Sequence, residues 1–422
     1  MRLAHDLLAL AQTRRMCWLL LLALVLLYMG WIGYVVSRDK PLDFYVYYIA
    51  AYGFAKGEDI YSAIGPVGKL VWDRLAAELG ITNYTLPYRY PPLAALLVWP
   101  LTFLPFQWAG LVWSVASGGA FIGSAWLMGK TGRASWGVNL AMALLLFFVP
   151  PLTTMHAGQV NGFVLLALAL PLYAFAQRRP SWMGIGVAAG TLLKLVPLAH
   201  LAYLGWRRQW RAALIGLLAL VLLFCLTIPL IGWQGVQAYA HNFFALGEAG
   251  NVFPGGSSQS LTSFFGRFLS PQGADGQLTG NPQLAQRLGL IVSLALALAT
   301  VVLCWPTGKL SNLFALEYAL VTVTVNLITP FVWYHQLVLL LIPFFVLARC
   351  ALMVPSLRWM LIPLAVGYVL TDLHGLIWHH LELWPLLAST PFYTMLMLWG
   401  LLAWLIFRAK RSPIVNQSSP VL

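Results

Sequence analysis

Charged side chains are scarce in this chain. Only 9% of its 422 residues are charged and only 12 are acidic, whereas 60% are hydrophobic. An ordinary soluble domain is roughly 25% charged and about 45–50% apolar. One or two water-soluble cores could not bury this much apolar surface, so the composition excludes a soluble globule. It indicates a protein whose solvent is the lipid bilayer.

Cysteine is scarce as well. Its four residues lie far apart, within or at the ends of apolar segments and without paired spacing: Cys17, Cys225, Cys304 and Cys350. This pattern predicts neither a disulfide framework nor a zinc site. The net charge of +13 would suit a nucleic-acid partner, but the cations stand in short clusters between apolar runs. Such clusters set membrane orientation, so no nucleic-acid partner is expected.

The apolar runs are long enough for about twelve transmembrane helices, which predicts an all-α polytopic membrane protein in a single domain, residues 1–422. The first run follows Arg14 and Arg15 like a signal peptide. It has no small-residue cleavage site before Arg38 and is expected to remain as a helix. The predicted spans are 16–36, 91–105, 107–129, 136–155, 160–177, 182–205, 212–232, 287–305, 313–331, 336–353, 358–375 and 391–407.

The Lys and Arg residues give this topology a direction. With the amino terminus inside, twelve cations fall on the inner face, and four fall in short outer loops: Lys130, Arg133, Arg178 and Arg179. Because inner loops are enriched in cations, this asymmetry predicts a multi-pass protein of the cell membrane. The short, Pro-rich span 91–105 is critical, since its failure to cross would invert everything after it. The basic cluster at 206–211 argues against that inversion, because it would then lie outside.

Two long connections, 37–90 and 233–286, are then both outside. The first is predicted to contain two amphipathic helices, at 43–56 and 68–79, that lie in the headgroup layer. The second is rich in Gly, Ser, Gln and Pro and is expected to become ordered around a ligand. Ten of the twelve acidic residues fall on or near this outer face. Any active site is therefore expected to face the periplasm or the outside.

Asp43 is the candidate catalytic residue. It opens the aromatic helix, where its carboxylate could act as a general base toward an incoming hydroxyl or could simply cap the helix. The acidic pair Glu58-Asp59 stands in the turn that follows. Arg89 lies in the extended segment Tyr88-Arg89-Tyr90-Pro91-Pro92, where it could bind phosphate through two hydrogen bonds or reach lipid headgroups.

Lys194 lies near the middle of the predicted span 182–205. A buried ammonium is costly unless it is paired, so Lys194 either binds an anionic group in a cavity or pairs with Glu317 or a carbonyl. The connection 156–162, on the predicted inner side, contains Gln159 and Asn161. Their side chains could bind a ligand or satisfy the ends of two helices.

Two outer segments offer further ligand groups. Gln259 and Ser260 provide neutral hydrogen bonds, and Arg267 adds a cation. Trp333 and His335 follow Pro330, and their aromatic faces suit sugar rings, although an aromatic belt looks the same. Acidic and imidazole side chains also gather at Asp372, His374, His379, His380 and Glu382. Their spacing matches no metal signature, and no metal is expected.

Taken in order, these segments resemble glycosyltransferase family 87. The motifs are Asp43-Phe44-x-x-Tyr47-Tyr48, then Gly57 and Tyr61, Tyr88-Arg89-Tyr90-Pro91-Pro92, Gly158-Gln159-x-Asn161, Lys194-x-x-Pro197, Gln259-Ser260-Leu261 and Pro330-x-x-Trp333-x-His335. Two positions depart from the family pattern. Gln336 stands where a second histidine is often found, and Thr329 stands where serine is common.

The resemblance implies a GT-C fold and a polyprenyl-phosphate sugar donor, with mannose as the default sugar. It implies that Asp43 deprotonates the hydroxyl of a lipid or glycan acceptor, which displaces the lipid phosphate with inversion. Cations at Arg89, Lys194 and Arg267 would hold that phosphate, so no cofactor is expected. His335 would bind phosphate or acceptor. The remaining motif residues are assigned to substrate binding: Tyr47, Tyr48, Tyr90, Gln159, Asn161, Gln259, Ser260 and Trp333.

Two other classes of protein share some of these features. A transporter or flippase of lipid-linked sugars could also use a midmembrane lysine and interrupted helices. However, the two halves of the chain show no repeat, and the polar candidates gather at one face. An O-antigen-type ligase or polymerase would differ mainly in using a long lipid-linked chain as donor.

Overall fold

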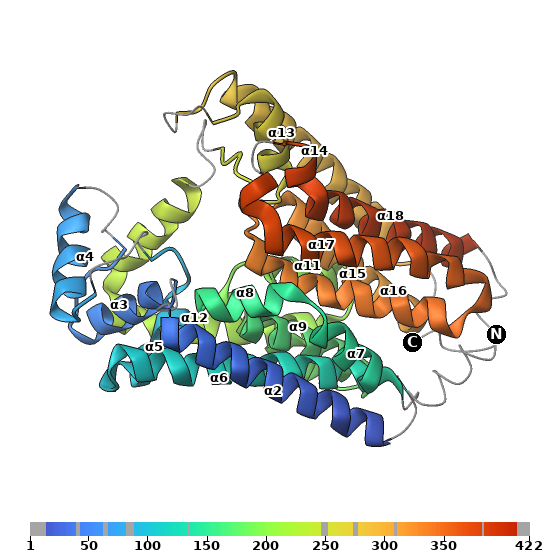
Figure 1. Cartoon of the computed structure of the whole chain (residues 1–422), viewed down its shortest axis with the longest axis horizontal. Helices are drawn as coiled ribbons and strands as arrows, with labels where there is room; N and C mark the ends of the chain where they lie inside the picture. Colours follow the sequence, from blue (N-terminus) through green and yellow to red (C-terminus); the bar gives the residue numbers. More distant parts are fainter. Residues whose placement is uncertain are drawn as a thin grey trace.

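The computed structural model describes residues 14–38, 43–61, 66–81, 88–132, 136–245, 252–272, 277–307, 310–381 and 384–411. Within these ranges the chain is helical, and the only β pairing is two isolated bridges. The long helices lie side by side in one bundle, with α3 (Phe44–Ala55) and α4 (Pro66–Glu78) at one end of it (Figure 1). The prediction of an all-α chain is confirmed for these residues.

Seven helical segments among the described residues are long and apolar enough to cross a bilayer. They comprise α2 (Arg14–Arg38), α6 (Phe106–Gly129), α12 (Trp210–Ala245), α14 (Pro282–Leu303), η2 with α16 (Tyr334–Leu340, Leu341–Met353), η3 with α17 (Pro355–Met360, Leu361–Leu381) and η4 with α18 (Leu387–Ser389, Thr390–Arg411). An eighth arises if α7 (Trp136–Leu146) and α8 (Val149–Ala157), bent by 60°, form one span. Counted by helix length and apolar composition, the described residues therefore hold fewer spans than the predicted twelve.

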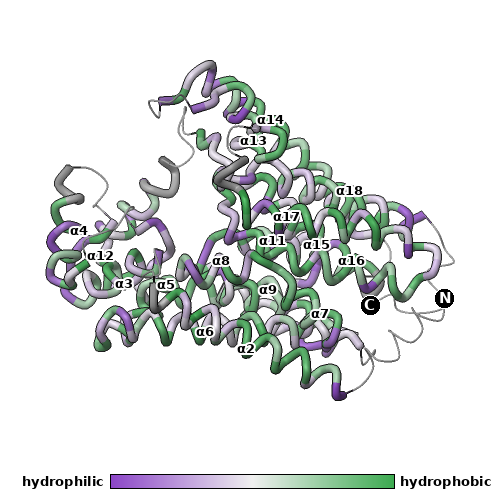
Figure 2. The backbone as a smooth tube through the Cα atoms, in the orientation of Figure 1, coloured by the Kyte–Doolittle hydropathy of each residue, from purple (hydrophilic) through white to green (hydrophobic). Residues whose placement is uncertain are grey.

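The remaining predicted spans are shorter helices. They are α5 with η1 (Pro92–Val98, Trp99–Phe103), α9 (Asn161–Ala176), α10 with α11 (Pro180–Leu193, Leu198–Trp206) and α15 (Leu310–Ile328). In the span formed by η2 and α16, 89% of the residues in the most apolar stretch are buried, so this span lies at the centre. In the spans of α12 and α14 only 11% of these residues are buried, so both lie on the outside. Hydrophobic residues dominate along the helices, and hydrophilic ones gather around α4 and at the opposite end (Figure 2).

The aromatic helix α3 differs from the expected amphipathic surface helix. Ten of its twelve residues are buried, including Phe44 and Tyr47. Gly53 permits its close contact with the following chain, because a Cβ there would lie 2.7 Å from Ile60 Cγ2. The helix α4 does have one buried face and one exposed face. The aromatic residues of α3 thus build a protein core in place of a headgroup layer.

The predicted span 91–105 does not cross the bundle. Near its start, Tyr61 donates a hydrogen bond to Tyr90 O at 2.7 Å, and near its end, Tyr48 donates to Leu104 O at 2.7 Å. Both ends therefore stay beside α3 and its following turn. A seven-residue helix followed by a five-residue 3-10 turn reaches only about 20 Å, against about 30 Å for a bilayer core. The topology predicted from the sequence is wrong at this point.

The predicted span 182–205 is a helical hairpin. The chain breaks at Lys194 (φ −158°, ψ 134°), three residues before Pro197. A Cβ at Gly216 of α12 would meet Gly184 O of α10 at 3.0 Å and Leu201 Cδ1 of α11 at 2.7 Å. The arms α10 and α11 thus both lie beside the first turns of α12, and the chain returns to the end where α10 began.

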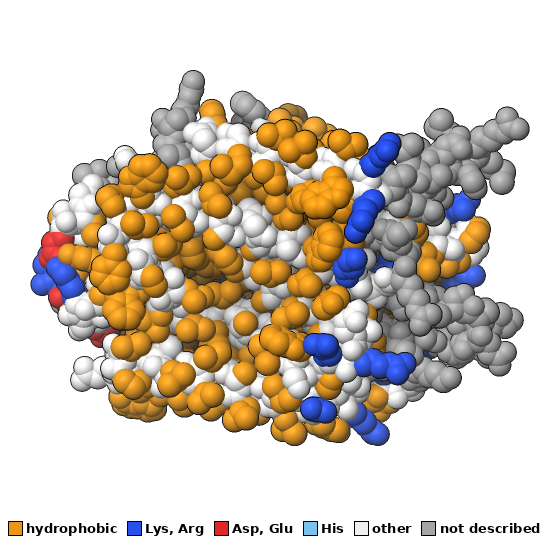
Figure 3. Space-filling model, turned by 90° about the horizontal axis from the view of Figure 1, so that it is seen from below, with side chains coloured by type: hydrophobic (Ala, Val, Ile, Leu, Met, Phe, Trp, Pro, Cys, Tyr) orange, Lys and Arg blue, Asp and Glu red, His pale blue; other side chains and the backbone are white. Residues whose placement is uncertain are grey.

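These two departures reverse the sidedness predicted for the loops between them. Arg349, predicted inside, donates to Thr131 Oγ1 at 2.9 Å in a turn predicted outside. Arg178 and Arg179, also predicted outside, line one cavity with Gln209. We define the cation-rich end of the bundle by Lys130, Arg178, Arg179, Arg207, Arg208, Arg349 and Lys410. Figure 3 shows a band of Lys and Arg near this end, and acidic side chains beside further Lys and Arg at the other.

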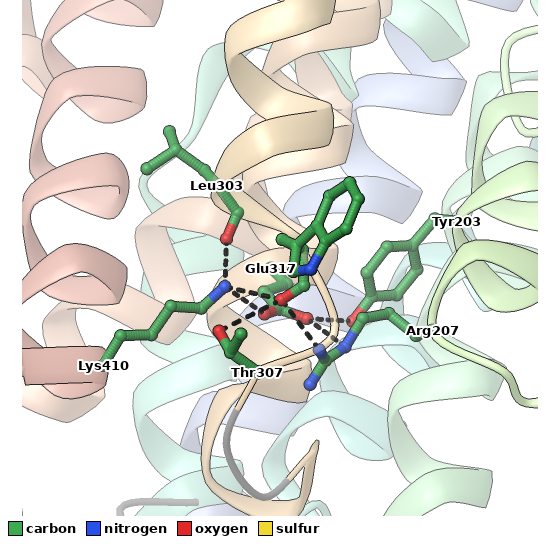
Figure 4. A network of polar contacts seen from close by, with 7 residues as sticks. Tyr203, Arg207, Leu303, Thr307, Glu317 and Lys410 are labelled. Carbon is green, nitrogen blue, oxygen red and sulfur yellow. Dashed lines mark hydrogen bonds and ion pairs between the residues drawn. The ribbon is translucent and has the colours of Figure 1, made fainter.

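A buried ionic network ties the hairpin to the bundle at the cation-rich end (Figure 4). Glu317 of α15 is fully buried, and its Oε2 lies 2.9 Å from Arg207 Nε. Tyr203 of α11 donates to the same oxygen at 3.0 Å, and Lys410 Nζ of α18 lies 3.9 Å from Oε1. The pairing of Lys194 with Glu317, considered from the sequence, is therefore wrong, because the partner of Glu317 is Arg207.

Candidate functional site

Asp43 lies at the first turn of α3, against the turn that follows α8. Its backbone N–H donates to Ala157 O at 2.7 Å, and its Oδ2 accepts from Gln159 Nε2 at 2.6 Å. The segment 156–162, predicted on the inner side, thus lies at the same end as Asp43, because 91–105 fails to cross. The side chain of Asp43 makes no capping hydrogen bond to α3. Its carboxylate therefore remains available for another purpose.

Gln159 holds the carboxylate, and two tyrosines hold Gln159. Gln159 is 3% exposed, and its Oε1 accepts from Tyr47 Oη at 2.9 Å and from Tyr90 Oη at 3.1 Å. Because two phenols donate to Oε1, the amide must present Nε2 to Asp43. The αL residue Gly158 (φ 72°) ends α8 and turns Gln159 inward, and Trp113 Nε1 donates to Gly158 O at 2.8 Å.

The charge state of this group follows from its surroundings. Burial raises the pKa of the Asp43 carboxyl, while the hydrogen bond from Gln159 and the charge of Lys194 oppose that rise. Burial also raises the pKa of Tyr90 to about 12 and that of Tyr47 well above its usual value. Both phenols therefore stay protonated and remain donors at neutral pH, whereas Asp43 is a stronger base than an exposed aspartate.

Lys194 stands at the tip of the hairpin and faces the same region. Its Nζ donates to Asn161 Oδ1 at 3.2 Å, and Asn161 Nδ2 donates to His335 O at 3.2 Å. Thr154 adds a second donor to His335 O at 2.8 Å. Among the described residues, the buried His335 Nε2 has no hydrogen-bond partner, and no carboxylate forms an ion pair with Lys194. This arrangement leaves an ammonium and an imidazole nitrogen for an anionic ligand.

Gln259 and Ser260 belong to a different group of contacts. Gln259 is fully buried; its Nε2 donates to Ala388 O at 2.9 Å and its Oε1 accepts from Phe392 N at 3.2 Å. Ser260 caps α13 (Leu261–Leu269), accepting from Ser263 N at 3.1 Å, and donates to Pro330 O at 2.7 Å. These bonds attach the loop before α13 to neighbouring elements. A contact of either residue with substrate stays a prediction.

Arg267 supports the same loop and keeps one free donor. It is 4% exposed, and its Nη1 donates to Ser258 O at 2.7 Å while its Nε donates to Ser389 Oγ at 2.8 Å. Burial lowers the pKa of this guanidinium to about 10. In the described part of the chain, Nη2 has no partner. Its expected contact with a lipid phosphate stays a prediction.

The other predicted residues differ in their exposure and their partners. Arg89 is exposed, and Tyr48 donates to Leu104 O, away from Gln159. The ring of Trp333 packs against that of Phe253, with the ring centroids 4.9 Å apart and the planes tilted by 60°. Glu58, a second acidic candidate, pairs with Arg74.

The segment 372–382 holds separate structural contacts. Asp372 Oδ1 accepts from Val149 N at the start of α8, and His374 Nε2 lies 3.0 Å from Gly256 O. The side chains of His379 and His380, and Glu382 as a whole, lie outside the described residues. Among the residues described, no three His, Cys, Asp or Glu side chains form a group that could hold a metal ion.

Two residues that hold the site were not found by sequence reasoning. Thr154 fixes the carbonyl of His335, and Trp113 fixes that of Gly158. Both lie on apolar helices, where a lone threonine or tryptophan carries no signal that distinguishes it from its neighbours. Only the fold brings them to the two turns that they stabilise.

The fold and the site define a multi-pass α-helical membrane protein with a partly buried carboxylate, ammonium and imidazole gathered at one end of its bundle. The chain belongs to glycosyltransferase family 87, whose family model matches residues 88–330. This match includes Tyr90, Gln159, Asn161 and Lys194; Asp43 precedes it and His335 follows it.

Curated relatives cover part of the chain. It is 30% identical over 280 residues to the polyprenol-phosphate-mannose-dependent alpha-(1-2)-phosphatidylinositol pentamannoside mannosyltransferase of Mycolicibacterium smegmatis, covering 64% of this chain and 62% of the relative. The protein of the same name from Mycobacterium tuberculosis is 26% identical, over 60% and 56% of the two chains. A phosphatidylinositol mannoside mannosyltransferase of Mycobacterium tuberculosis is 28% identical, over 48% and 49%. The matches thus span about half to three fifths of these relatives. No solved structure matches the chain.

Proposed function

We propose that this protein is a membrane glycosyltransferase that moves a hexose, mannose by family default, from a polyprenyl-phosphate donor to a hydroxyl of a lipid or glycan acceptor. The observation that carries the proposal is the partly buried Asp43 carboxylate, held by Gln159 and accompanied by Lys194 and His335. The relatives are named as polyprenol-phosphate-mannose-dependent mannosyltransferases, which supports the donor and the sugar. The GT-C fold implied by the resemblance is part of this proposal.

In the proposed reaction Asp43 is the general base. It takes the proton of the acceptor hydroxyl while that oxygen attacks the anomeric carbon of the donor sugar. The bond from this carbon to the phosphate oxygen breaks on the opposite face, and the electron pair leaves with polyprenyl phosphate, so the configuration inverts. The raised pKa of the Asp43 carboxyl makes it a stronger base, and a catalytic pKa nearer the working pH favours proton transfer.

Lys194 and His335 are proposed to bind the leaving phosphate. An ammonium at the tip of the hairpin, bound only to an amide oxygen among described residues, can neutralise the charge that develops on the phosphate. The unpartnered Nε2 of His335 can hydrogen-bond to the same phosphate or to the acceptor. Asn161 links the two groups, since it contacts Lys194 and the carbonyl of His335.

The orientation of the site follows from the charge asymmetry. Cations concentrate on the inner side of membrane proteins, so we propose that the cation-rich end lies inside. Asp43 would then face the periplasm or the outside of the cell membrane. At that level a lipid-linked donor can present its sugar at the membrane surface while its polyprenyl chain stays among the lipids.

The proposal is tested by sugar transfer with the purified protein in lipid. Radiolabelled polyprenyl-phosphate mannose and a mixed membrane-lipid acceptor extract are supplied to wild type, to Asp43→Asn and to the matched control Asp59→Asn. Asp59 lies in the same outer segment, and its Oδ1 accepts from Tyr61 N at 3.0 Å. Loss of general-base catalysis should reduce transfer by about 10²–10⁴-fold in the first variant and leave the second close to wild type.

Equal transfer by wild type and a folded Asp43→Asn variant would remove Asp43 as the base. A second outcome would overturn the enzyme assignment. If wild type transfers no sugar from any polyprenyl-phosphate donor but moves the intact donor across vesicle membranes, the protein is a transporter or flippase.

A further inference from the structure

A cavity of 480 Å³ lies at the cation-rich end, far along the bundle from Asp43. One part of its wall is polar and cationic, and the rest is apolar. The polar wall consists of Thr131, Arg178, Arg179 and Gln209. The apolar wall includes Phe175 of α9 and Phe314 of α15, whose rings stack at 3.9 Å. A cavity with these two walls fits an amphipathic anion better than a purely polar or purely apolar ligand.

Arg178 has a backbone conformation that arginine rarely adopts. Its φ is 56°, and Arg208, in the turn between α11 and α12, has φ 58°. A left-handed conformation strains any residue with a Cβ, and glycine usually fills such positions. A strained non-glycine residue is a reason to look for a function of its side chain. Arg178 lines the cavity, whereas Arg208 does not, so the pair provides an internal comparison.

A third arginine adds uncompensated positive charge next to this cavity. Arg349 is 2% exposed, and its Nη1 donates to Thr131 Oγ1 in the cavity wall. Within the described ranges its Nε has no partner, and no carboxylate forms an ion pair with it. A buried guanidinium without an anion is unfavourable. Helix α10 also begins at Pro180 in the wall, and a helix N-terminus favours an anion.

We propose that this cavity binds the headgroup of an anionic phospholipid from the leaflet at the cation-rich end. The phosphate would lie between Arg178, Arg179 and the first turn of α10, and an acyl chain would lie against Phe175 and Phe314. Exposed tryptophans at the nearby helix ends, Trp182 and Trp210, mark a membrane–water boundary. A lipid supplies both the anion and the apolar part that the two walls require. This site goes beyond the proposed transfer reaction, which takes place at the other end.

The test compares two substitutions that are matched in charge and backbone. Arg178→Gly and Arg208→Gly each remove one exposed arginine and relieve one positive-φ strain. Each protein is purified in neutral detergent, and its Tm is measured as phosphatidylglycerol, phosphatidylcholine or inorganic phosphate is added. We expect phosphatidylglycerol to raise the Tm of wild type and of Arg208→Gly. Arg178→Gly should need at least roughly ten times as much of this lipid for the same rise in Tm, because charge-assisted hydrogen bonds to the phosphate are lost.

Three results would overturn the proposal. If both variants lose the response equally, the lipid is attracted by the overall positive charge of this end and not by the cavity. If Arg178→Gly responds like wild type, or wild type does not respond, the cavity binds no anionic phospholipid. If inorganic phosphate stabilises as well as phosphatidylglycerol does, the site is for a free anion. Sugar transfer by Arg178→Gly in neutral lipid should remain normal, so failure of this proposal is distinguishable from failure of the proposed function.

Discussion

The ionisation of Asp43 depends on Gln159, and the substitution Gln159→Leu tests that dependence. Gln159 Nε2 donates to Asp43 Oδ2 at 2.6 Å, and this bond lowers the carboxyl pKa against the opposing effect of burial. Leucine has a similar size and no donor. It leaves the desolvation in place while the hydrogen bond is lost, so the pKa of Asp43 should rise further.

The size of the effect follows from the strength of such a bond. A hydrogen bond to a charged group contributes about 1.5–3 kcal/mol, and about 1.4 kcal/mol corresponds to one pH unit. The pKa of Asp43 should therefore rise by about one to two pH units. Since only the carboxylate can accept a proton, activity is lost as the pH falls through this pKa. The acid limb of log kcat/KM should move to higher pH by the same amount.

The assay is the pH profile of sugar transfer for wild type, Gln159→Leu and Tyr48→Phe. Tyr48 belongs to the same helix as Tyr47, but its hydroxyl donates to Leu104 O, so its loss should leave the acid limb unchanged. Gln159→Leu also leaves the hydroxyls of Tyr47 and Tyr90 without their acceptor, at a cost of about 1–3 kcal/mol each. The profile is therefore measured well below the Tm of the variant.

One result would refute the reasoning. If Gln159→Leu lowers activity at every pH and leaves the acid limb where it is in wild type, Gln159 does not control the ionisation of Asp43. Its role would then be to bind substrate, as the sequence predicts. Recovery of activity at high pH is the expected result, because there Asp43 is ionised without the help of Gln159.

Three further predictions concern stability and topology. Glu317→Gln should lower the free energy of unfolding by about 3–5 kcal/mol, because it leaves the buried charge of Arg207 unpaired. Calorimetry should show that the double variant Arg207→Met with Glu317→Leu regains most of the lost stability. Gly129→Ala should lower the Tm, since its Cβ would lie 2.3 Å from backbone of α7 and overpacking costs about 1–3 kcal/mol; an unchanged Tm would contradict this contact. Single cysteines at Lys130 and Arg208, in a chain without its native cysteines, should react with an impermeant maleimide from the same side of the membrane, whereas the alternating twelve-span topology requires opposite sides.

The candidate residues and the predicted topology came from the same sequence and disagree with each other. The motif order identified Asp43, Gln159, Asn161, Lys194 and His335, which the structure brings to one end of the bundle. Topology reasoning nevertheless placed Gln159 on the face opposite Asp43. Both conclusions came from the same sequence, and they conflict because hydropathy measures how apolar a segment is and not whether it crosses. The hydrogen bond between the two side chains resolves the conflict.

Gln259, Ser260 and Arg267 show a second limit. Their residue types suit a ligand, and sequence alone cannot distinguish a polar group that binds substrate from one that binds its own chain. In the fold, Gln259 and Ser260 use their polar atoms on the backbone of neighbouring segments. Arg267 donates from Nη1 to the backbone carbonyl of Ser258 and from Nε to the hydroxyl of Ser389, and in the described part of the chain its Nη2 has no partner. Burial and hydrogen-bond partners are tertiary properties, which the sequence does not show.

By itself the sequence determined that lipid surrounds this protein, that its segments are helical, and which side chains are candidates for its chemistry. Those properties depend on composition, periodicity and residue type, which are local. Only the tertiary structure showed which apolar segments run from one end of the bundle to the other. The segment 91–105 is held at both ends beside α3, and 182–205 folds back at Lys194 against α12. Whether a segment crosses or returns depends on the partners that satisfy its ends, and those partners lie far away in the chain.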